Sequence, residues 1–172
     1  MRKIILNVAV SLDSYIEGPN GEYDWCFDDQ DYGLTDFFKA CDAIFIGRKS
    51  YELIMRTDPK MFAAMKIYVF SDTLHDPQAD NVEIIRPADF KNRVEEIRSQ
   101  EGRDIWLFGG AELVEAFIKK NLISELLLSV HPVILGSGKP LFTNIKERIN
   151  LVLLDAEQFS SGLIQLRYII KP

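Results

Sequence analysis

Residues 104–118 read DIWLFGGAELVEAFI, and the interpretation of the whole chain starts from this stretch. An apolar run over residues 105–108 stops at Gly109 and Gly110, after which apolar residues recur at helical spacing. This pattern predicts a strand, a tight turn and a helix start. Two residues without Cβ at a helix start let a ligand approach free backbone N–H groups, and the helix dipole favours an anion such as phosphate there. A plain glycine turn is the alternative, and these residues alone do not decide between the two.

The composition indicates an acidic globular protein. The chain has 172 residues, 47% hydrophobic and 27% charged, which fits one domain over residues 1–172 without disulfides or metal. The net charge of -6 and the lack of a basic stripe argue against a nucleic-acid surface. Cys26 and Cys41 have neither metal-ligand nor redox spacing, and residues 1–3 lead into a strand pattern instead of a signal peptide. These two features predict a cytoplasmic protein. No apolar run approaches the roughly 20 residues of a membrane helix, which argues against a membrane protein.

Strand and helix patterns alternate along most of the chain. Buried strands are predicted over residues 4–12, 43–46, 66–70, 82–85 and 124–130, and helices over residues 34–41, 51–55 and 88–100. Two further strands, over residues 151–159 and 163–170, are joined by a short Ser-Ser-Gly turn and predict a hairpin. The sequence therefore predicts a three-layer α/β/α domain whose mixed sheet ends in an antiparallel hairpin.

Three of the predicted strand ends carry polar or glycine-rich turns. They are formed by Gly47, Arg48, Lys49 and Ser50, by Ser71, and by Gly109 and Gly110. Ligands of open parallel sheets bind outside the carboxyl ends of the strands, so we expect these turns to share one site. Two glycine turns suit two phosphate groups, and Arg48 and Lys49 add cations, which fits a dinucleotide with an extra phosphate. Each turn taken alone is more often a capped surface turn.

Other chemistry-bearing residues give weaker signals. The chain has no Rossmann or P-loop fingerprint, and its two histidines, His75 and His131, are expected to be neither metal ligands nor bases. A proton donor or an anchor for a pterin-like ring could be among the aspartates Asp28, Asp29, Asp31 and Asp36. A solvated acidic loop is the alternative for the first three. Asp36 is the catalytic candidate because Phe37 and Phe38 should place it beside an apolar surface.

Four motifs resemble the dihydrofolate reductase superfamily. They are VAVSLDSYI (residues 8–16), DAIFIGRKSYE (42–52), LFGGAEL (107–113) and PVILGSGKPLF (132–142). They occur in order over most of the chain. The branch that they resemble most is the C-terminal reductase domain of RibD, the bacterial riboflavin-biosynthesis deaminase/reductase.

This resemblance implies a dihydrofolate reductase-like fold with eight strands, and NADPH-dependent hydride transfer to a small heterocycle, as in 5-amino-6-(5-phosphoribosylamino)uracil reductase. The family pattern assigns Ala9 and Ile16 to the nicotinamide, Gly47, Arg48, Lys49 and Ser50 to the cofactor phosphates, Ser71 to the adenosine end, and Gly109, Gly110, Ala111 and Glu112 to the pyrophosphate. Trp25 matches a tryptophan that follows the first loop of the folate enzymes. Trp25 and Asp36 are thus the candidates for the substrate pocket.

The resemblance also raises alternatives and further expectations. A true dihydrofolate reductase is one alternative, although the acidic substrate residue of those enzymes has no clear counterpart here, and a catalytically silent nucleotide-binding protein is another. We expect the peptide between Gly109 and Gly110 to be cis. We also expect a homodimer, formed through the apolar residues Leu163, Leu166 and Ile169 of the terminal hairpin.

Overall fold

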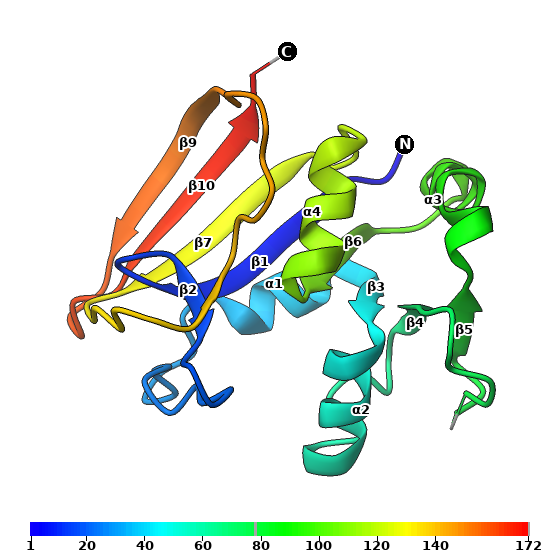
Figure 1. Cartoon of the computed structure of the whole chain (residues 1–172), viewed down its shortest axis with the longest axis horizontal. Coiled ribbons are helices and arrows are strands. Elements are labelled where there is room, and N and C mark those ends of the chain that lie inside the picture. Colours follow the sequence, from blue (N-terminus) through cyan, green and yellow to red (C-terminus); the bar gives the residue numbers. More distant parts are fainter. Residues whose placement is uncertain (78, 172) are drawn as a thin grey trace.

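An eight-stranded mixed sheet spans the molecule (Figure 1). The computed structural model describes residues 1–77 and 79–171. The strands are β1 (Ile4–Ser11), β3 (Cys41–Gly47), β4 (Lys66–Phe70), β5 (Val82–Ile85), β6 (Asp104–Gly109), β7 (Glu125–His131), β9 (Leu151–Gln158) and β10 (Ile164–Ile170). They lie in the order β5-β4-β3-β6-β1-β7-β10-β9, with the first six parallel and β10 antiparallel to both of its neighbours. The predicted mixed sheet with an antiparallel hairpin is confirmed.

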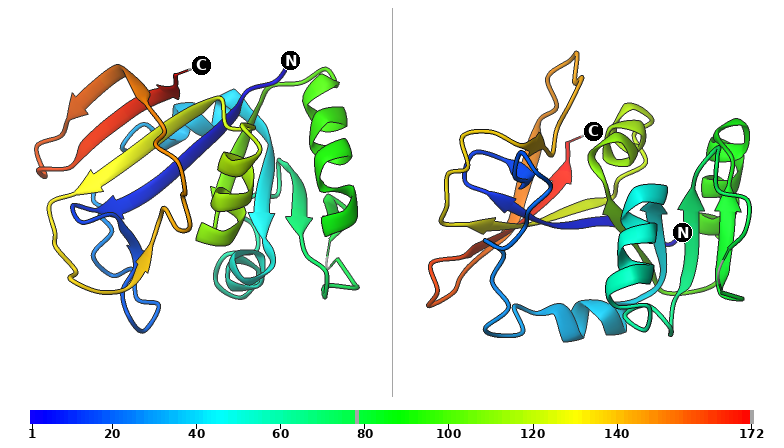
Figure 2. Two further views of the ribbon diagram at one scale, coloured as in Figure 1. Left: turned by 45° about the horizontal axis from the view of Figure 1, so that its top comes forward. Right: turned by 60° about the horizontal axis from the view of Figure 1, so that its bottom comes forward.

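Helices cover both faces of the sheet. One core contains residues of α3 (Phe90–Ser99) and α4 (Ala111–Lys119), and the other contains residues of α1 (Leu34–Ala40) and α2 (Arg48–Thr57). Figure 2, right, shows α1 and α4 on opposite sides of the sheet. Successive strand residues point to opposite faces, so Phe45 packs in the first core while Ile44 and Ile46 pack in the second. None of the helices in the described residues has the length and apolar character needed to cross a membrane.

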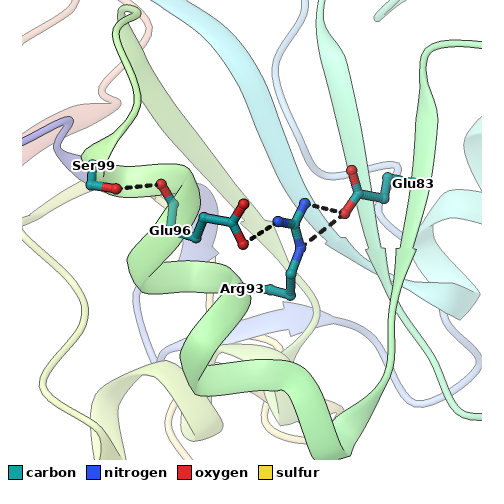
Figure 3. Close-up of polar contacts among 4 residues, drawn as sticks. All are labelled: Glu83, Arg93, Glu96 and Ser99. Atoms are coloured by element: carbon teal, nitrogen blue, oxygen red, sulfur yellow. Dashed lines mark hydrogen bonds and ion pairs between the residues drawn. The ribbon is translucent and has the colours of Figure 1, made fainter.

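Charged side chains attach α3 to the edge strand β5. A short 3-10 turn (Pro87–Asp89) leads from this strand into the helix. The Arg93 guanidinium on α3 donates to the Glu83 carboxylate on β5, with 3.1 Å between Nε and Oε1, and pairs with Glu96 on its own helix (Figure 3). Hydrogen bonds to Glu96 and Glu83 raise the pKa of Arg93. This network fixes the position of the β5 end, which contributes to the site described below.

Two short strands form a second, separate sheet. β2 (Tyr15–Glu17) pairs antiparallel with β8 (Lys139–Pro140), although more than 120 residues separate them in the chain. The sequence patterns predicted only turns in both segments. A Cβ placed on Gly138 would lie 2.1 Å from the Glu17 carbonyl oxygen, so only glycine allows these two backbones to approach so closely.

The β9–β10 hairpin extends beyond the helices (Figure 1). All eight residues of β9 are exposed, including Leu151, Val152, Leu153 and Leu154. The expectation that Leu163 takes part in a dimer interface is wrong, because its side chain is 1% exposed within its own chain. Leu166 and Ile169 on β10 are half-buried. The exposed apolar surface of the hairpin therefore lies mainly on β9.

Candidate functional site

A cleft of about 390 Å³ opens at the carboxyl ends of the parallel strands β3, β4, β5 and β6. Its lining comprises Gly47, Arg48, Lys49, Ser50, Phe70, Ser71, Asp72, Ile85, Pro87, Phe90, Gly110, Ala111, Glu112, Leu113, Ala116 and Lys139. The three predicted turns thus meet in one cleft, as expected for an open parallel sheet.

The two glycine turns lie against each other. A Cβ placed on Gly47 would be 3.6 Å from the Gly109 carbonyl oxygen and 3.7 Å from the Gly110 nitrogen, so the starts of α2 and α4 are neighbours. The peptide between Gly109 and Gly110 is cis, which confirms the expectation. Neither helix start has a side-chain cap, so the N–H groups of the first turn have no acceptor from a capping side chain. Both helix starts line the cleft. Such helix starts favour anions.

The cations of the cleft differ in their surroundings. Arg48 donates from one nitrogen to both carboxylate oxygens of Glu52, at 2.9 and 3.0 Å, so part of its charge is balanced within α2. Lys49 is exposed, and Lys139 is half-buried. The acids Asp72 and Glu112 also line the cleft. Three cations and two acids line the cleft, in a protein whose net charge is -6.

Apolar side chains line one part of the cleft. They are Phe70, Ile85 and Phe90, and the Phe70 and Phe90 rings pack directly against each other with their centroids 5.1 Å apart. Ser71, predicted at the adenosine end, also lines the cleft, but its hydroxyl oxygen accepts the N–H groups of residues 73 and 74 at 3.1 and 2.9 Å. The Ser71 side chain therefore shapes its own turn. The sequence patterns assigned Ile85 and Phe90 only to the core. An apolar pattern shows that a side chain is buried, but it does not show whether that side chain also lines a cleft.

Three of the predicted cofactor residues do not line this cleft. Ala9 lies on β1, Ile16 lies on β2 and packs against the larger core, and Gly109 is buried behind Gly110. The nicotinamide contacts assigned to Ala9 and Ile16 stay predictions. Lys139 is a further lining residue that the sequence patterns did not assign to the site, since no local pattern placed residue 139 beside Gly110.

The loop that carries Trp25 is anchored to the end of β7 by His131. The Nε2 atom of His131 accepts the Phe27 N–H at 3.1 Å, and its Nδ1 lies 3.0 Å from the Ser129 carbonyl oxygen. A neutral ring with its proton on Nδ1 satisfies both contacts. Burial lowers the pKa of His131, which is 2% exposed. Trp25 packs edge-on against this ring at 5.3 Å, and its indole N–H is buried without a partner among the described groups.

The acidic candidates lie outside the cleft. Asp36 has an 88% exposed side chain and pairs with Lys39 at 3.1 Å, so the apolar environment expected for it is wrong. Its catalytic role stays a prediction that this geometry does not support. Asp28 is exposed, Asp29 accepts the Tyr32 hydroxyl at 2.6 Å, and Asp31 accepts the Thr35 N–H at 3.1 Å. These contacts favour the solvated-loop interpretation of the first three aspartates.

The two cysteines are poor nucleophiles. Burial raises the pKa of the Cys26 thiol to about 11 and that of Cys41 to about 12. Both thiols are therefore protonated at neutral pH.

Comparisons with known proteins agree with this fold. The RibD C-terminal domain profile matches residues 2–165. The uncharacterized protein YyaP of Bacillus subtilis (strain 168) is 44% identical over 97% of this chain and 94% of its own. A crystal structure from Shewanella sp. PV-4, of a protein provisionally assigned to riboflavin biosynthesis, covers both chains completely with 24% identity and a TM-score of 0.84. The Thermotoga maritima diaminohydroxyphosphoribosylaminopyrimidine deaminase/5-amino-6-(5-phosphoribosylamino)uracil reductase aligns with 13% identity and a TM-score of 0.76, over 99% of this chain and 57% of its own. The chain belongs to the RibD C-terminal domain family, a riboflavin-pathway-like reductase family with the dihydrofolate reductase-like fold.

Proposed function

We propose that the protein is an NADPH-dependent reductase that transfers a hydride to a small heterocycle of the kind reduced in riboflavin biosynthesis. The observation that carries this proposal is the cleft in which the uncapped starts of α2 and α4 meet beside Arg48, Lys49 and Lys139. Membership of a reductase family that is generally NADPH-dependent supports it.

The cleft fits the charge and shape of such a cofactor. Two helix starts can each receive a phosphate through backbone N–H groups, and the glycines at both starts leave room for the phosphate oxygens. The apolar surface of Phe70, Ile85 and Phe90 suits one face of a flat adenine ring. Arg48 and Lys49 on α2 supply cations for a 2′-phosphate, which NADPH has and NADH lacks.

The bound nicotinamide would supply the hydride, so the protein needs to bind, orient and exclude water more than to react covalently. In our proposal the turns at residues 47–50 and 110–112 hold the phosphates. The loop that carries Trp25 is fixed at the carboxyl end of β7 by the contact between Phe27 and His131. This loop is the candidate wall of the substrate pocket, with Trp25 as its predicted substrate residue.

NADPH oxidation with a panel of substrates tests the proposal. The absorbance of reduced nicotinamide should fall when the phosphoribosylaminouracil substrate is added, and should stay constant without substrate. Turnover of dihydrofolate alone would favour a true dihydrofolate reductase. Binding of NADPH without turnover of any heterocycle would favour a catalytically silent nucleotide-binding protein, and failure to bind NADPH would refute the proposal.

We also propose that the protein forms a homodimer through the β9–β10 hairpin. Leu151, Val152, Leu153 and Leu154 are between 40% and 52% exposed on an edge strand. Such an edge associates with another chain unless something covers it. A second copy of the same hairpin would pair with itself across a twofold axis, which is the commonest symmetry of soluble oligomers. The hairpin and the cleft are separated by β1 and β7, so this pairing would leave the cleft open.

A further inference from the structure

Lys139 places a cation at the start of α4 from a distant part of the chain. It lies on β8 and lines the cleft together with Gly110 and Ser50. A Cβ placed on Gly110 would lie 3.7 Å from Lys139 Nζ and 3.7 Å from Ser50 Oγ. The ammonium group, the hydroxyl group and the first turn of α4 therefore surround the same point of the cleft.

The backbone that carries this lysine is held at three places. The Asp13 carboxylate accepts two backbone N–H groups of the preceding loop, at 2.8 and 3.1 Å. The Gly138 backbone lies directly against the Glu17 carbonyl, where any side chain would clash. Leu141 donates its N–H to the Ser14 carbonyl at 2.9 Å, and its side chain is buried. A lysine on such a fixed backbone needs little rearrangement of the main chain to bind a ligand.

The charge of Lys139 is not paired with any of the residues that the structure describes. No ion pair among residues 1–77 and 79–171 includes it, although Glu17 is its neighbour across β2 and β8. Arg48, in contrast, is paired with Glu52. A half-buried ammonium group that faces a cleft and is not paired with a carboxylate can be neutralised by an anionic ligand.

We propose that Lys139 binds the diphosphate that joins the two halves of the nicotinamide cofactor, an inference that rests on the proposed function. Its ammonium group faces the start of α4, whereas Arg48 and Lys49 lie on α2, where an additional phosphate would bind. NADPH and NADH share the diphosphate and differ in the 2′-phosphate. Lys139 therefore contributes equally to the affinity for both cofactors, and Arg48 and Lys49 contribute to NADPH alone.

Titrations of four proteins with NADPH and with NADH test this assignment. They are the wild type, Lys139→Met, Lys139→Arg and the control Lys66→Met, which removes a half-buried lysine at the amino end of β4. Lys139→Met should lower the affinity for both cofactors on the order of tenfold, since a charge-assisted hydrogen bond is lost. Lys139→Arg should recover most of this loss, and Lys66→Met should bind as the wild type does. Urea unfolding of each variant confirms that the fold is retained.

The outcomes separate this inference from the proposed function. Wild type that binds NADPH, together with Lys139→Met of unchanged affinity, would overturn the role of Lys139 and leave the reductase proposal standing. A loss confined to NADPH would also overturn it, because Lys139 would then face the 2′-phosphate. Wild type that binds neither cofactor would refute the proposed function and this inference with it.

Discussion

Gly110→Ala should separate cofactor binding from stability. Gly110 has φ -75° and ψ -166°, values that alanine adopts without strain. The added Cβ would meet Lys139 Nζ and Ser50 Oγ at 3.7 Å, which is an ordinary contact distance. The free energy of unfolding should therefore stay the same or rise by about 0.4 to 1 kcal/mol, since alanine restricts the unfolded chain.

Cofactor affinity should fall sharply in the same variant. The methyl group would occupy the space between the helix start, the ammonium group and the hydroxyl group, where phosphate oxygens must approach the α4 N–H groups. Losing one or two charge-assisted hydrogen bonds costs about 1.5 to 3 kcal/mol, which corresponds to roughly 10- to 100-fold in Kd.

The neighbouring Gly109→Ala is the matched control. Gly109 has φ +109°, a conformation that strains any other residue, so this variant should lose about 1 to 3 kcal/mol of stability. Its Cβ would point toward Val114 instead of the cleft, at 3.7 Å, so the folded fraction should bind NADPH normally. NADPH titration by tryptophan fluorescence and urea unfolding measure both quantities. Gly110→Ala with wild-type affinity would remove Gly110 from the site.

Three further changes test other parts of the structure. The double variant Arg48→Met, Lys49→Met should lower the affinity for NADPH about tenfold and leave the affinity for NADH nearly unchanged. Equal losses of affinity for the two cofactors would exclude a 2′-phosphate contact. Stability in urea should fall as the pH drops below about 6.5, because burial lowers the pKa of folded His131 while the unfolded histidine takes up a proton. His131→Gln should flatten this pH dependence and the exposed His75→Gln should not, and a slope that persists in His131→Gln would contradict this assignment. Leu153→Glu on β9 should yield a monomer of 19.7 kDa by light scattering while the wild type has twice that mass, and a monomeric wild type would refute the dimer.

The sequence patterns were sufficient for the main sheet and for most of the cleft. Strands buried on both faces have continuous apolar sequences, so they could be predicted without knowing which strands they pair with. The turns at Gly47, Ser71 and Gly110 could be assigned to one site because parallel strands share one carboxyl edge. Local patterns combined with this one rule of topology therefore predicted which turns meet in the cleft.

Features that depend on long-range contacts were not predictable in this way. The pairing of β2 with β8 joins two segments with weak strand patterns, and it alone brings Lys139 beside Gly110. Asp36 was placed beside an apolar surface because Phe37 and Phe38 follow it. Consecutive residues of a helix point in different directions, so the Asp36 carboxylate faces solvent although Phe37 is buried. Leu163 was assigned to an interface from the apolar pattern, which does not distinguish a buried side chain from an exposed one.

The position of β1 in the sheet affects how the chain folds during synthesis. β1 leaves the ribosome well before both of its neighbours in the sheet: Ile4 pairs with Ile105 of β6, and Ile5 pairs with Glu125 of β7. At roughly 5 to 20 residues per second, the strand waits on the order of 5 to 20 seconds for its first partner. Over that time an apolar segment, IILNVAVS, has none of its final contacts within the sheet. We expect the nascent chain to need chaperone protection until residue 131 has emerged, and the same topology predicts slow refolding of the purified protein.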